Sequence, residues 1–253
     1  MVIIAGHRGA RDLWPENSIL GFRNLYGLGA DAVEFDVHQS SDGGIVVIHD
    51  PLLDRTAHGT GPVGERSLKH LTSIQLRDAG GECIPTLGEV LDVFSDTALE
   101  LQIEIKTDAL GNVYQGLEAK LIEEIRRRGL QRRAILTCFV PEVIETVRKQ
   151  APDAQVLASL DRRSAEMMGG IKPALERFAR IRDCIVAIEK TLLMPAMPLA
   201  LGILGPARIG AWVTNTPEDI SYWLGQPVRQ ITTDRPDLAV SIRRKLETAP
   251  ARA

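Results

Sequence analysis

Short apolar segments typical of buried strands alternate along this chain with segments that have helical periodicity. When the return strand of one hairpin is set aside, eight strand-like segments remain, and a helix-like segment follows each of them. Eight such units in 253 residues are typical of a TIM (β/α)8 barrel, which usually needs about 250 residues. A doubly wound open sheet is the alternative, but no glycine-rich nucleotide motif follows any strand. The strands are expected to begin near residues 2, 32, 99, 134, 155, 185, 209 and 230.

The helices between these strands carry start and stop signals. Pro15 followed by Asn17 or Ser18 marks the start of the first helix, and glycines close it. Thr86 and Glu89 predict a capping box at the start of another helix. The later helices are expected at about 86–94, 113–128, 141–150, 164–182, 195–204, 217–224 and 236–247.

Composition limits the class of protein. With 44% hydrophobic residues, 25% charged residues and a formal net charge of -3, the chain resembles an ordinary soluble globular protein. It has no basic excess that would suggest nucleic acid, no apolar run near the roughly 20 residues of a membrane span, and no signal-peptide pattern. We therefore expect one cytoplasmic domain over residues 1–253, with a small-molecule substrate, no nucleic-acid partner and no stable membrane association. The oligomeric state is left open, and the three cysteines are expected to be reduced thiols.

Residues 32–50 are predicted to form a β-hairpin that carries chemistry. Alternate side chains of a strand share a face, so Glu34 and Asp36 point the same way, with His38 next in line. The turn SSDGG is too short for a parallel crossover, so the return strand should run antiparallel and bring His49 roughly opposite Phe35 and Asp36. Such a polar set is often only a solvated face, and we expect His38 to be exposed near the turn. Apolar residues at the alternate positions instead favour a buried strand, where carboxylates must be paired or bind a metal.

Polar residues also stand at the predicted carboxyl ends of other strands, where TIM barrels place their active sites. His7 ends the first strand, and Glu104 and Lys106 end the third. Asp234 and Arg235 follow the last strand, and we expect them to form a structural ion pair at the barrel rim.

Three carboxylates among these residues form a hard-oxygen ligand set, which suits Mg²⁺ or Ca²⁺ better than zinc. Fixed positive charge beside such a metal indicates an anionic substrate, for which phosphate is the natural candidate. Histidine titrates near neutrality, so one imidazole can accept a proton from a nucleophile while another donates to the leaving oxygen. Together these groups fit metal-assisted cleavage of a phosphodiester. The carboxylates are Glu34, Asp36 and Glu104, the cations are Arg8 and Lys106, and the imidazoles are His7 and His49.

Residues 50–85 interrupt the regular alternation with a segment rich in glycine, aspartate, threonine and proline. A long irregular segment in a compact domain is usually functional. The segment contains no aromatic residue, which disfavours docking to a membrane. His58 and His70 within it are expected to lie at the surface.

Several short motifs occur along the chain in a fixed order. They are HRGA at 7–10, PENS at 15–18, VEFDV at 33–37, VIHD at 47–50, DRT at 54–56, G-x-G at 59–61, IPTLGEVL at 84–91, IEIK at 103–106 and TDRPD at 233–237. In these motifs the chain resembles the glycerophosphodiester phosphodiesterase family from residue 4 onward. The resemblance implies a TIM barrel with a small inserted segment at about 50–85. It also implies hydrolysis of glycerophosphodiesters to sn-glycerol 3-phosphate and an alcohol, with one divalent cation, Mg²⁺ or Ca²⁺.

The resemblance also implies roles for individual residues. The histidines of HRG and HD, His7 and His49, correspond to the catalytic pair, with His7 favoured as base and His49 as acid. Arg8 and Lys106 correspond to phosphate contacts. Whether water or a glycerol hydroxyl is the nucleophile is left open. The metal ligands implied by the motifs EFD and EIK are Glu34, Asp36 and Glu104.

Three further residues are candidates for contact with the substrate. Trp212 and Phe139 either wall the glycerol pocket or pack in the core. Glu189, an acid at a strand end, is a candidate to contact a substrate hydroxyl. Asn17 is expected to cap its helix rather than touch the substrate, although its loop should border the site.

Other functions would use the same fold. A lysophospholipase D or a sugar-phosphate phosphodiesterase would keep the metal and change the substrate, and a lipid substrate would favour an exposed apolar rim. A non-catalytic phosphate-ester binding protein should have lost a histidine or a metal acid, yet all five are present. A magnesium-dependent carbon–carbon lyase would not need paired histidines.

Overall fold

The strands of this chain form one sheet that closes on itself. Within residues 1–248, which the computed structural model describes, they are β1 Ile3–His7, β2 Ala32–Gln39, β3 Ile45–Val47, β4 Glu100–Ile105, β5 Ala134–Cys138, β6 Gln155–Leu160, β7 Ile185–Glu189, β8 Ile209–Trp212 and β9 Gln230–Thr233. Their order is β1-β9-β8-β7-β6-β5-β4-β2-β3, and β1 also pairs with β2. All neighbours are parallel except β2 and β3, so in this part of the chain eight parallel strands close a barrel and β3 lies outside it. The predicted TIM barrel is confirmed.

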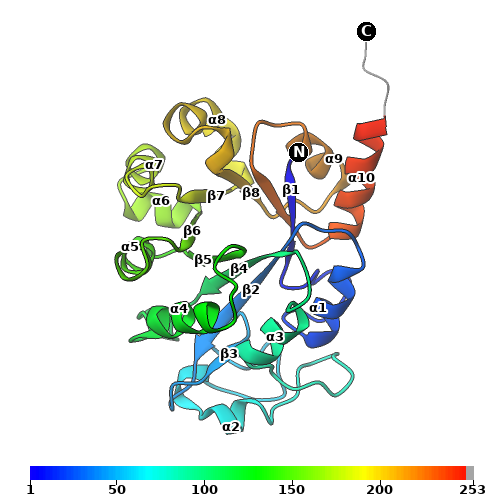
Figure 1. The fold of residues 1–253 in the computed structure, drawn as a ribbon, viewed down its shortest axis with the longest axis vertical. Helices are drawn as coiled ribbons and strands as arrows, with labels where there is room; N and C mark the ends of the chain where they lie inside the picture. The colour runs from blue at the N-terminus through cyan, green and yellow to red at the C-terminus, as the bar shows by residue number, and fades with distance from the viewer. Residues whose placement is uncertain (249–253) are drawn as a thin grey trace.

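Helices connect the strands and surround the barrel (Figure 1). Most of them present one apolar face to the strands, which is where their buried residues lie. They are α1 Ile19–Tyr26, α2 Leu68–Leu71, α3 Leu87–Val93, α4 Leu117–Arg127, α5 Pro141–Gln150, α6 Arg162–Met167, α7 Ile171–Ala179, α8 Lys190–Leu204, α9 Pro217–Leu224 and α10 Pro236–Thr248.

Two helical segments differ from the sequence prediction. The predicted helix at 164–182 is two helices, α6 and α7, because Gly169 and Gly170 between them adopt positive φ angles of 87° and 112°. Helix α8 begins at Lys190 rather than at 195, although it contains two prolines. The capping box of Thr86 and Glu89 at the start of α3 is confirmed.

The register of the barrel strands places polar residues side by side. His7 of β1 is paired with Glu34 of β2, and Asp36 of β2 is paired with Glu104 of β4. His7 and Glu104 lie at or next to the carboxyl ends of their strands, and the register brings Glu34 and Asp36 level with them, so the four side chains gather at one end of the barrel. The alternate residues of β2, such as Phe35, belong to the main hydrophobic core.

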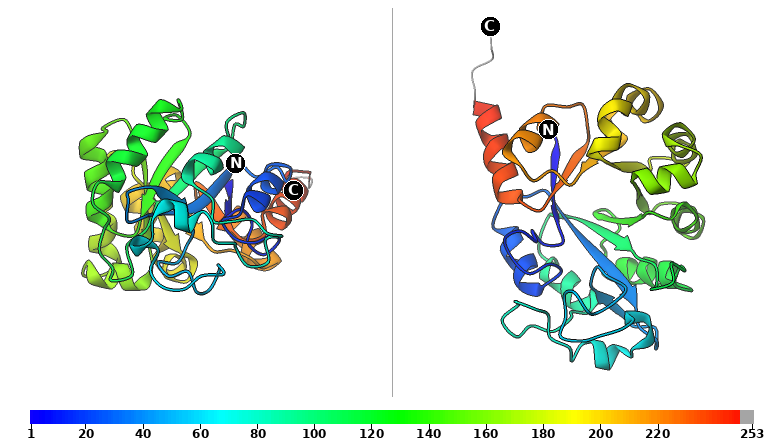
Figure 2. Two further views of the ribbon diagram at one scale, coloured as in Figure 1. Left: turned by 90° about the horizontal axis from the view of Figure 1, so that it is seen from below. Right: turned by 180° about the vertical axis from the view of Figure 1, so that it is seen from behind.

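Residues 50–85 form a separate unit beside the barrel (Figure 2). They contain two short helical turns, η1 at Val63–Glu65 and α2. Their apolar side chains pack with those of β3 and its following residue into a second hydrophobic core, while His58 and His70 are exposed, as predicted. The members of this second core are Val46, Ile48, Leu53, Ala57, Val63, Leu71, Ile74, Leu76, Ala79 and Ile84.

The structure also tests two expectations drawn from composition. No helix within residues 1–248 combines the length and the apolar character that crossing a membrane requires. The cysteines are free thiols, and burial raises the pKa of Cys138 to about 12 and that of Cys184 to about 11, which keeps both protonated. A cytoplasmic location and a single domain over residues 1–253 stay predictions, and residues 249–253 lie outside the described part of the chain.

Candidate active site

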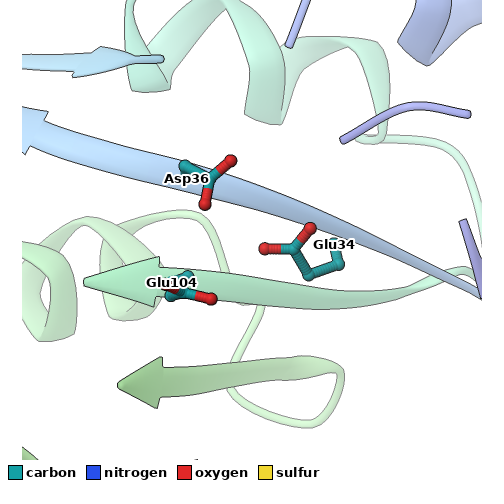
Figure 3. Close-up of side chains that lie close together, drawn as sticks. All are labelled: Glu34, Asp36 and Glu104. Carbon is teal, nitrogen blue, oxygen red and sulfur yellow. The ribbon is translucent and has the colours of Figure 1, made fainter. Parts of the chain in front are cut away.

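Three buried carboxylates meet where the middle of β2 lies beside the carboxyl end of β4 (Figure 3). One oxygen from each of Glu34, Asp36 and Glu104 lies within 4.8 Å of the other two. Glu34 and Asp36 are two residues apart on β2 and therefore share a face, and Glu104 lies on the neighbouring strand. The structure thus brings together the three residues that the sequence predicts as metal ligands.

The surroundings of this triad fit a divalent cation. Glu34 Oε1 is buried and has no hydrogen-bond partner within residues 1–248. Burial, together with the carboxylates of Asp36 and Glu104, raises the pKa of Glu34 well above its usual value. A buried oxygen without a partner, beside two more carboxylates, provides the donors that Mg²⁺ and Ca²⁺ prefer. The residues present therefore suit such an ion.

Two cations contact the triad. Lys106 Nζ lies 2.9 Å from Asp36 Oδ1 and also contacts Glu104. Arg8 Nε lies 3.3 Å from Asp36 Oδ2, and the Arg8 backbone N–H donates to Glu34 Oε2 at 3.2 Å. Burial alone would raise the pKa of Asp36, but these two cations hold it well below its usual value. Arg8 and Lys106 therefore lie where they could contact an anion bound beside the three carboxylates.

His7 is oriented by a buried aspartate. Its Nδ1 lies 2.5 Å from Asp234 Oδ1. Asp234 also accepts a hydrogen bond of 2.7 Å from Asn215 Nδ2 and pairs with Arg11 Nε at 3.0 Å. Burial alone would raise the pKa of Asp234, but the hydrogen bond with His7 lowers it to about 2. Because a carboxylate accepts, the Nδ1–H of His7 donates in this hydrogen bond, and Nε2 on the other side of the ring lies 3.8 Å from Glu34 Oε2.

The predicted ion pair between Asp234 and Arg235 is wrong. Arg235 pairs with Asp237 at 2.8 Å instead. Successive side chains after a strand point to opposite sides, so only Asp234 faces the neighbouring strand β1 and its terminal His7.

His49 is oriented by the residue that follows it. Its Nδ1 lies 2.6 Å from Asp50 Oδ1, which leaves Nε2 available in the same way as in His7. Burial is the main cause that lowers the pKa of His49. Asp50 accepts two hydrogen bonds from Arg55, at 2.5 Å and 3.0 Å. Burial alone would raise the pKa of Asp50, but the hydrogen bonds from Arg55 and His49 lower it to about 2.

His38 is fully buried, contrary to the expectation that it is exposed near the turn. Its Nε2 lies 3.0 Å from the backbone oxygen of His49, and its Nδ1 lies 2.9 Å from the Tyr114 hydroxyl. A carbonyl oxygen only accepts, so Nε2 carries the proton and Nδ1 accepts from Tyr114. Burial lowers the pKa of His38 to about 4, so the ring is neutral at pH 7. Its place after Glu34 and Asp36 in the strand alternation was the signal for this buried position.

The loop after β1 has an unusual backbone. Arg8, Gly9 and Ala10 have φ angles of 50°, 76° and 68°, and Asn17 has 56°. For residues other than glycine, such conformations cost about 1–3 kcal/mol and persist only where the surroundings fix them. Asn17 does not cap α1, which Ser18 does, but donates from Nδ2 to Asp36 Oδ2 at 2.9 Å. The loop is therefore fastened to β2.

A cavity of about 320 Å³ opens between the strand ends. Six of the predicted site residues line it, namely His7, Arg8, Glu34, His49, Glu104 and Lys106. Phe139 and Trp212 form an aromatic wall, with their rings edge to face and centroids 5.9 Å apart. Glu189 does not line the cavity, and its Oε1 accepts from the Thr191 hydroxyl at 2.6 Å. The polar residues deeper in the barrel that line the cavity are Gln102, Thr137, Ser159 and Thr232.

Comparison with known proteins gives a consistent result. A sequence model of the glycerophosphoryl diester phosphodiesterase family matches residues 7–238. A glycerophosphodiester phosphodiesterase of Caldanaerobacter subterraneus is 36% identical over 162 residues, which are 61% of this chain and 65% of that protein.

Solved structures share the fold over almost the whole chain. One is a crystal structure of a candidate glycerophosphoryl diester phosphodiesterase from Agrobacterium tumefaciens, which superposes on this chain with a TM-score of 0.89 at 26% identity. The superposition covers 98% of this chain and 100% of that one. A phosphodiesterase of Oleispira antarctica, solved with its product sn-glycerol-3-phosphate, has a TM-score of 0.80 at 22% identity and covers 96% of each chain. Together with the match over residues 7–238, these findings show that the chain is an enzyme of the glycerophosphoryl diester phosphodiesterase family, as its sequence predicts.

Proposed function

We propose that this protein hydrolyses glycerophosphodiesters to sn-glycerol 3-phosphate and an alcohol, using a divalent cation and two histidines. One observation supports this most: a three-carboxylate metal position, two cations and two aspartate-oriented imidazoles surround a single cavity. Family membership supports the same substrate class.

In this proposal each histidine moves one proton. Arg8 and Lys106 bind the non-bridging oxygens of the phosphate. His7 Nε2 takes a proton from the nucleophile, which is water or a hydroxyl of the glycerol, as the new bond to phosphorus forms. Attack by the glycerol hydroxyl gives a cyclic phosphate, and water then opens this ring in a second displacement to give sn-glycerol 3-phosphate. His49 Nε2 donates a proton to the leaving oxygen as the old bond breaks. The lowered pKa of His49 rises when the phosphate binds, because a nearby negative charge favours the imidazolium.

The metal ion would be held by Glu34, Asp36 and Glu104. When bound, a divalent cation supplies positive charge that stabilises the developing charge on the phosphoryl oxygens. Both Mg²⁺ and Ca²⁺ accept carboxylate ligands, and we propose either ion for this site.

Two neighbouring cavities support separate positions for the two arms of the diester. Beside the inner cavity lies an open cavity of about 510 Å³, and both are lined by Glu104, Lys106 and Phe139. Hydroxyl-bearing residues line the inner cavity, which suits a glycerol group. Met167 and Met168 line the outer cavity, and methionine adapts to groups of different shape. We assign the glycerol to the inner cavity and the leaving alcohol to the outer one.

The test is release of sn-glycerol 3-phosphate from glycerophosphocholine by protein treated with EDTA and then resupplied with Mg²⁺ or Ca²⁺. We expect release only when metal is restored, and little release by the Glu34→Gln variant. The His58→Ala variant, which changes an exposed histidine of the insertion, should match the wild type.

Other substrates distinguish the alternatives. Release of choline from lysophosphatidylcholine, without turnover of glycerophosphocholine, would support a lysophospholipase D. Turnover of a sugar phosphodiester alone would support a sugar-phosphate phosphodiesterase. Failure of the folded, metal-loaded protein on all three substrates would support a binding protein.

A further inference from the structure

Arg55, which belongs to the insertion, holds two carboxylates at once. Its Nε and Nη2 donate to Asp50 at 2.5 Å and 3.0 Å. Its Nη1 and Nη2 donate to Glu16 at 2.8 Å and 2.7 Å. The guanidinium therefore makes a two-point contact with each acid, one from the insertion and one from the loop after β1.

Each of these acids is also the partner of a group in the proposed machinery. Asp50 binds His49 Nδ1 at 2.6 Å, and Glu16 accepts from Arg8 Nη1 at 3.1 Å. A continuous row of hydrogen bonds thus runs from His49 through Asp50, Arg55 and Glu16 to Arg8. The row joins the proposed proton donor to the proposed phosphate contact.

The insertion fixes Arg55 from both sides. Leu53 and Ala57 are buried in the second hydrophobic core, and the Ala57 backbone N–H donates to the Leu53 carbonyl oxygen at 3.0 Å. The Leu53 N–H donates to the Gly61 oxygen at 3.0 Å. Arg55 therefore approaches the site from a rigid turn, although its own side chain is 48% exposed.

From this geometry we propose that Arg55 is a positioning residue for proton donation to the leaving alcohol. It orients the Asp50–His49 pair, and the insertion at 50–85 serves to hold it in place. Arginine suits this task because its planar guanidinium can bind two carboxylates in a fixed orientation, which the single ammonium of lysine cannot do. The proposal rests on the proposed role of His49 as the acid.

Two substrates test it through their leaving groups. Choline leaves glycerophosphocholine as a basic alkoxide that needs a proton, whereas p-nitrophenolate leaves the p-nitrophenyl ester of glycerol 3-phosphate without one. In the Arg55→Met variant we expect kcat to fall about tenfold or more on the choline ester, because the donor is misplaced, and to stay within about twofold on the nitrophenyl ester. Changes in KM should be common to both substrates, because both carry the same phosphate.

Matched variants make the result specific. Arg66→Met changes another exposed arginine of the insertion, whose side chain donates to the backbone oxygen of Thr60, and it should leave both activities unchanged. Arg55→Lys should give an intermediate loss on the choline ester. Ethylguanidinium added to the Arg55→Ala variant should restore turnover of the choline ester and leave the nitrophenyl ester as it was.

Three results would overturn the proposal. Equal losses of kcat on both esters in Arg55→Met, with an unchanged melting temperature, would show that Arg55 supports the site as a whole and not proton donation in particular. Unchanged turnover of the choline ester in Arg55→Met would show that His49 needs no such support. If the wild type hydrolysed neither ester, the proposed function itself would fail, and the role of Arg55 would fail with it.

Discussion

The two proposed catalytic histidines are held by different parts of the molecule. His7 ends β1 inside the barrel, and its partner Asp234 is completely buried after the neighbouring strand β9. His49 follows β3 outside the barrel, and the side chain of its partner Asp50 is 24% exposed and depends on Arg55. In the barrel half of the site, pairing of β1 with β9 brings His7 and Asp234 together. In the insertion half, side-chain contacts near solvent hold His49 and Asp50 in place.

This difference matches what the chemistry asks of each histidine. A base is needed to activate the nucleophile whatever the leaving group is. A proton donor is needed only when the leaving group is a strong base. In the proposed mechanism, the base that serves every substrate therefore lies in the barrel, and the acid whose contribution depends on the substrate lies next to the insertion.

The largest expected effect separates the two histidines directly. His7→Ala should lower kcat/KM by about 10²–10⁴-fold on both the choline and the nitrophenyl ester. His49→Ala should cause a comparable loss on the choline ester but less than about tenfold on the nitrophenyl ester. Steady-state kinetics measure both. Equal sensitivity of the two esters to His49→Ala would show that His49 is not the acid.

The next effect concerns the two aspartates. Asp234→Asn should reduce kcat about a hundredfold on both esters, because Asp234 is completely buried and an asparagine in its place no longer fixes the tautomer of His7. Asp50→Asn should reduce kcat about tenfold and on the choline ester only, since Arg55 and solvent remain close to that pair. A larger loss for Asp50→Asn would reverse the proposed contrast between the halves.

Metal loading should affect the barrel half most. At a concentration about a hundred times the Kd, Mg²⁺ or Ca²⁺ should stabilise the fold by about 2.7 kcal/mol, which raises the Tm by about 5–10 °C. Glu104→Gln should abolish the shift, and Glu65→Gln, in the exposed η1 turn of the insertion, should keep it. Hydrogen exchange should show protection in β2 and β4. Protection confined to the insertion would place the metal elsewhere.

The smallest effect is the pH dependence of stability. Asp234 and Asp50 have pKa values lowered to about 2, so each favours the fold above its ordinary pKa of about 3.9 and loses that contribution as the pH falls toward 2. Between pH 5 and pH 3 Asp234 should lose about 1 kcal/mol, and the more exposed Asp50 less. The melting temperature of Asp234→Asn should therefore fall less between pH 5 and pH 3 than that of the wild type. An equal fall in both proteins would show that this carboxylate does not contribute to the pH dependence of stability.

Local patterns explain what the sequence could predict. The alternation of strand-like and helix-like segments is a local property, and it led to the barrel. Glu34 and Asp36 are two residues apart on one strand, so their common face follows from strand geometry alone. Glu104 joins them because β4 pairs with β2 in the barrel, which places Glu104 beside Asp36.

Contacts that depend on closure of the barrel or on loop geometry do not follow from the sequence. Asp234 reaches His7 only because β9 pairs with β1, which joins the two ends of the chain. Arg55 reaches Glu16 because the insertion folds back over the loop after β1. The nearby turn predicts that His38 is exposed, but Tyr114, which lies far along the chain, packs against its ring and hydrogen-bonds to it.

The left-handed run of Arg8, Gly9 and Ala10 has a consequence for the kinetics of binding. A loop whose backbone is already fixed against β2 has no ordering step to complete when the substrate arrives. If Arg8 binds the phosphate as proposed, the substrate meets an arginine that is already in place, and diffusion and orientation govern its capture. The observed rate of substrate binding should rise linearly with substrate concentration, without the plateau that a slow loop closure would impose.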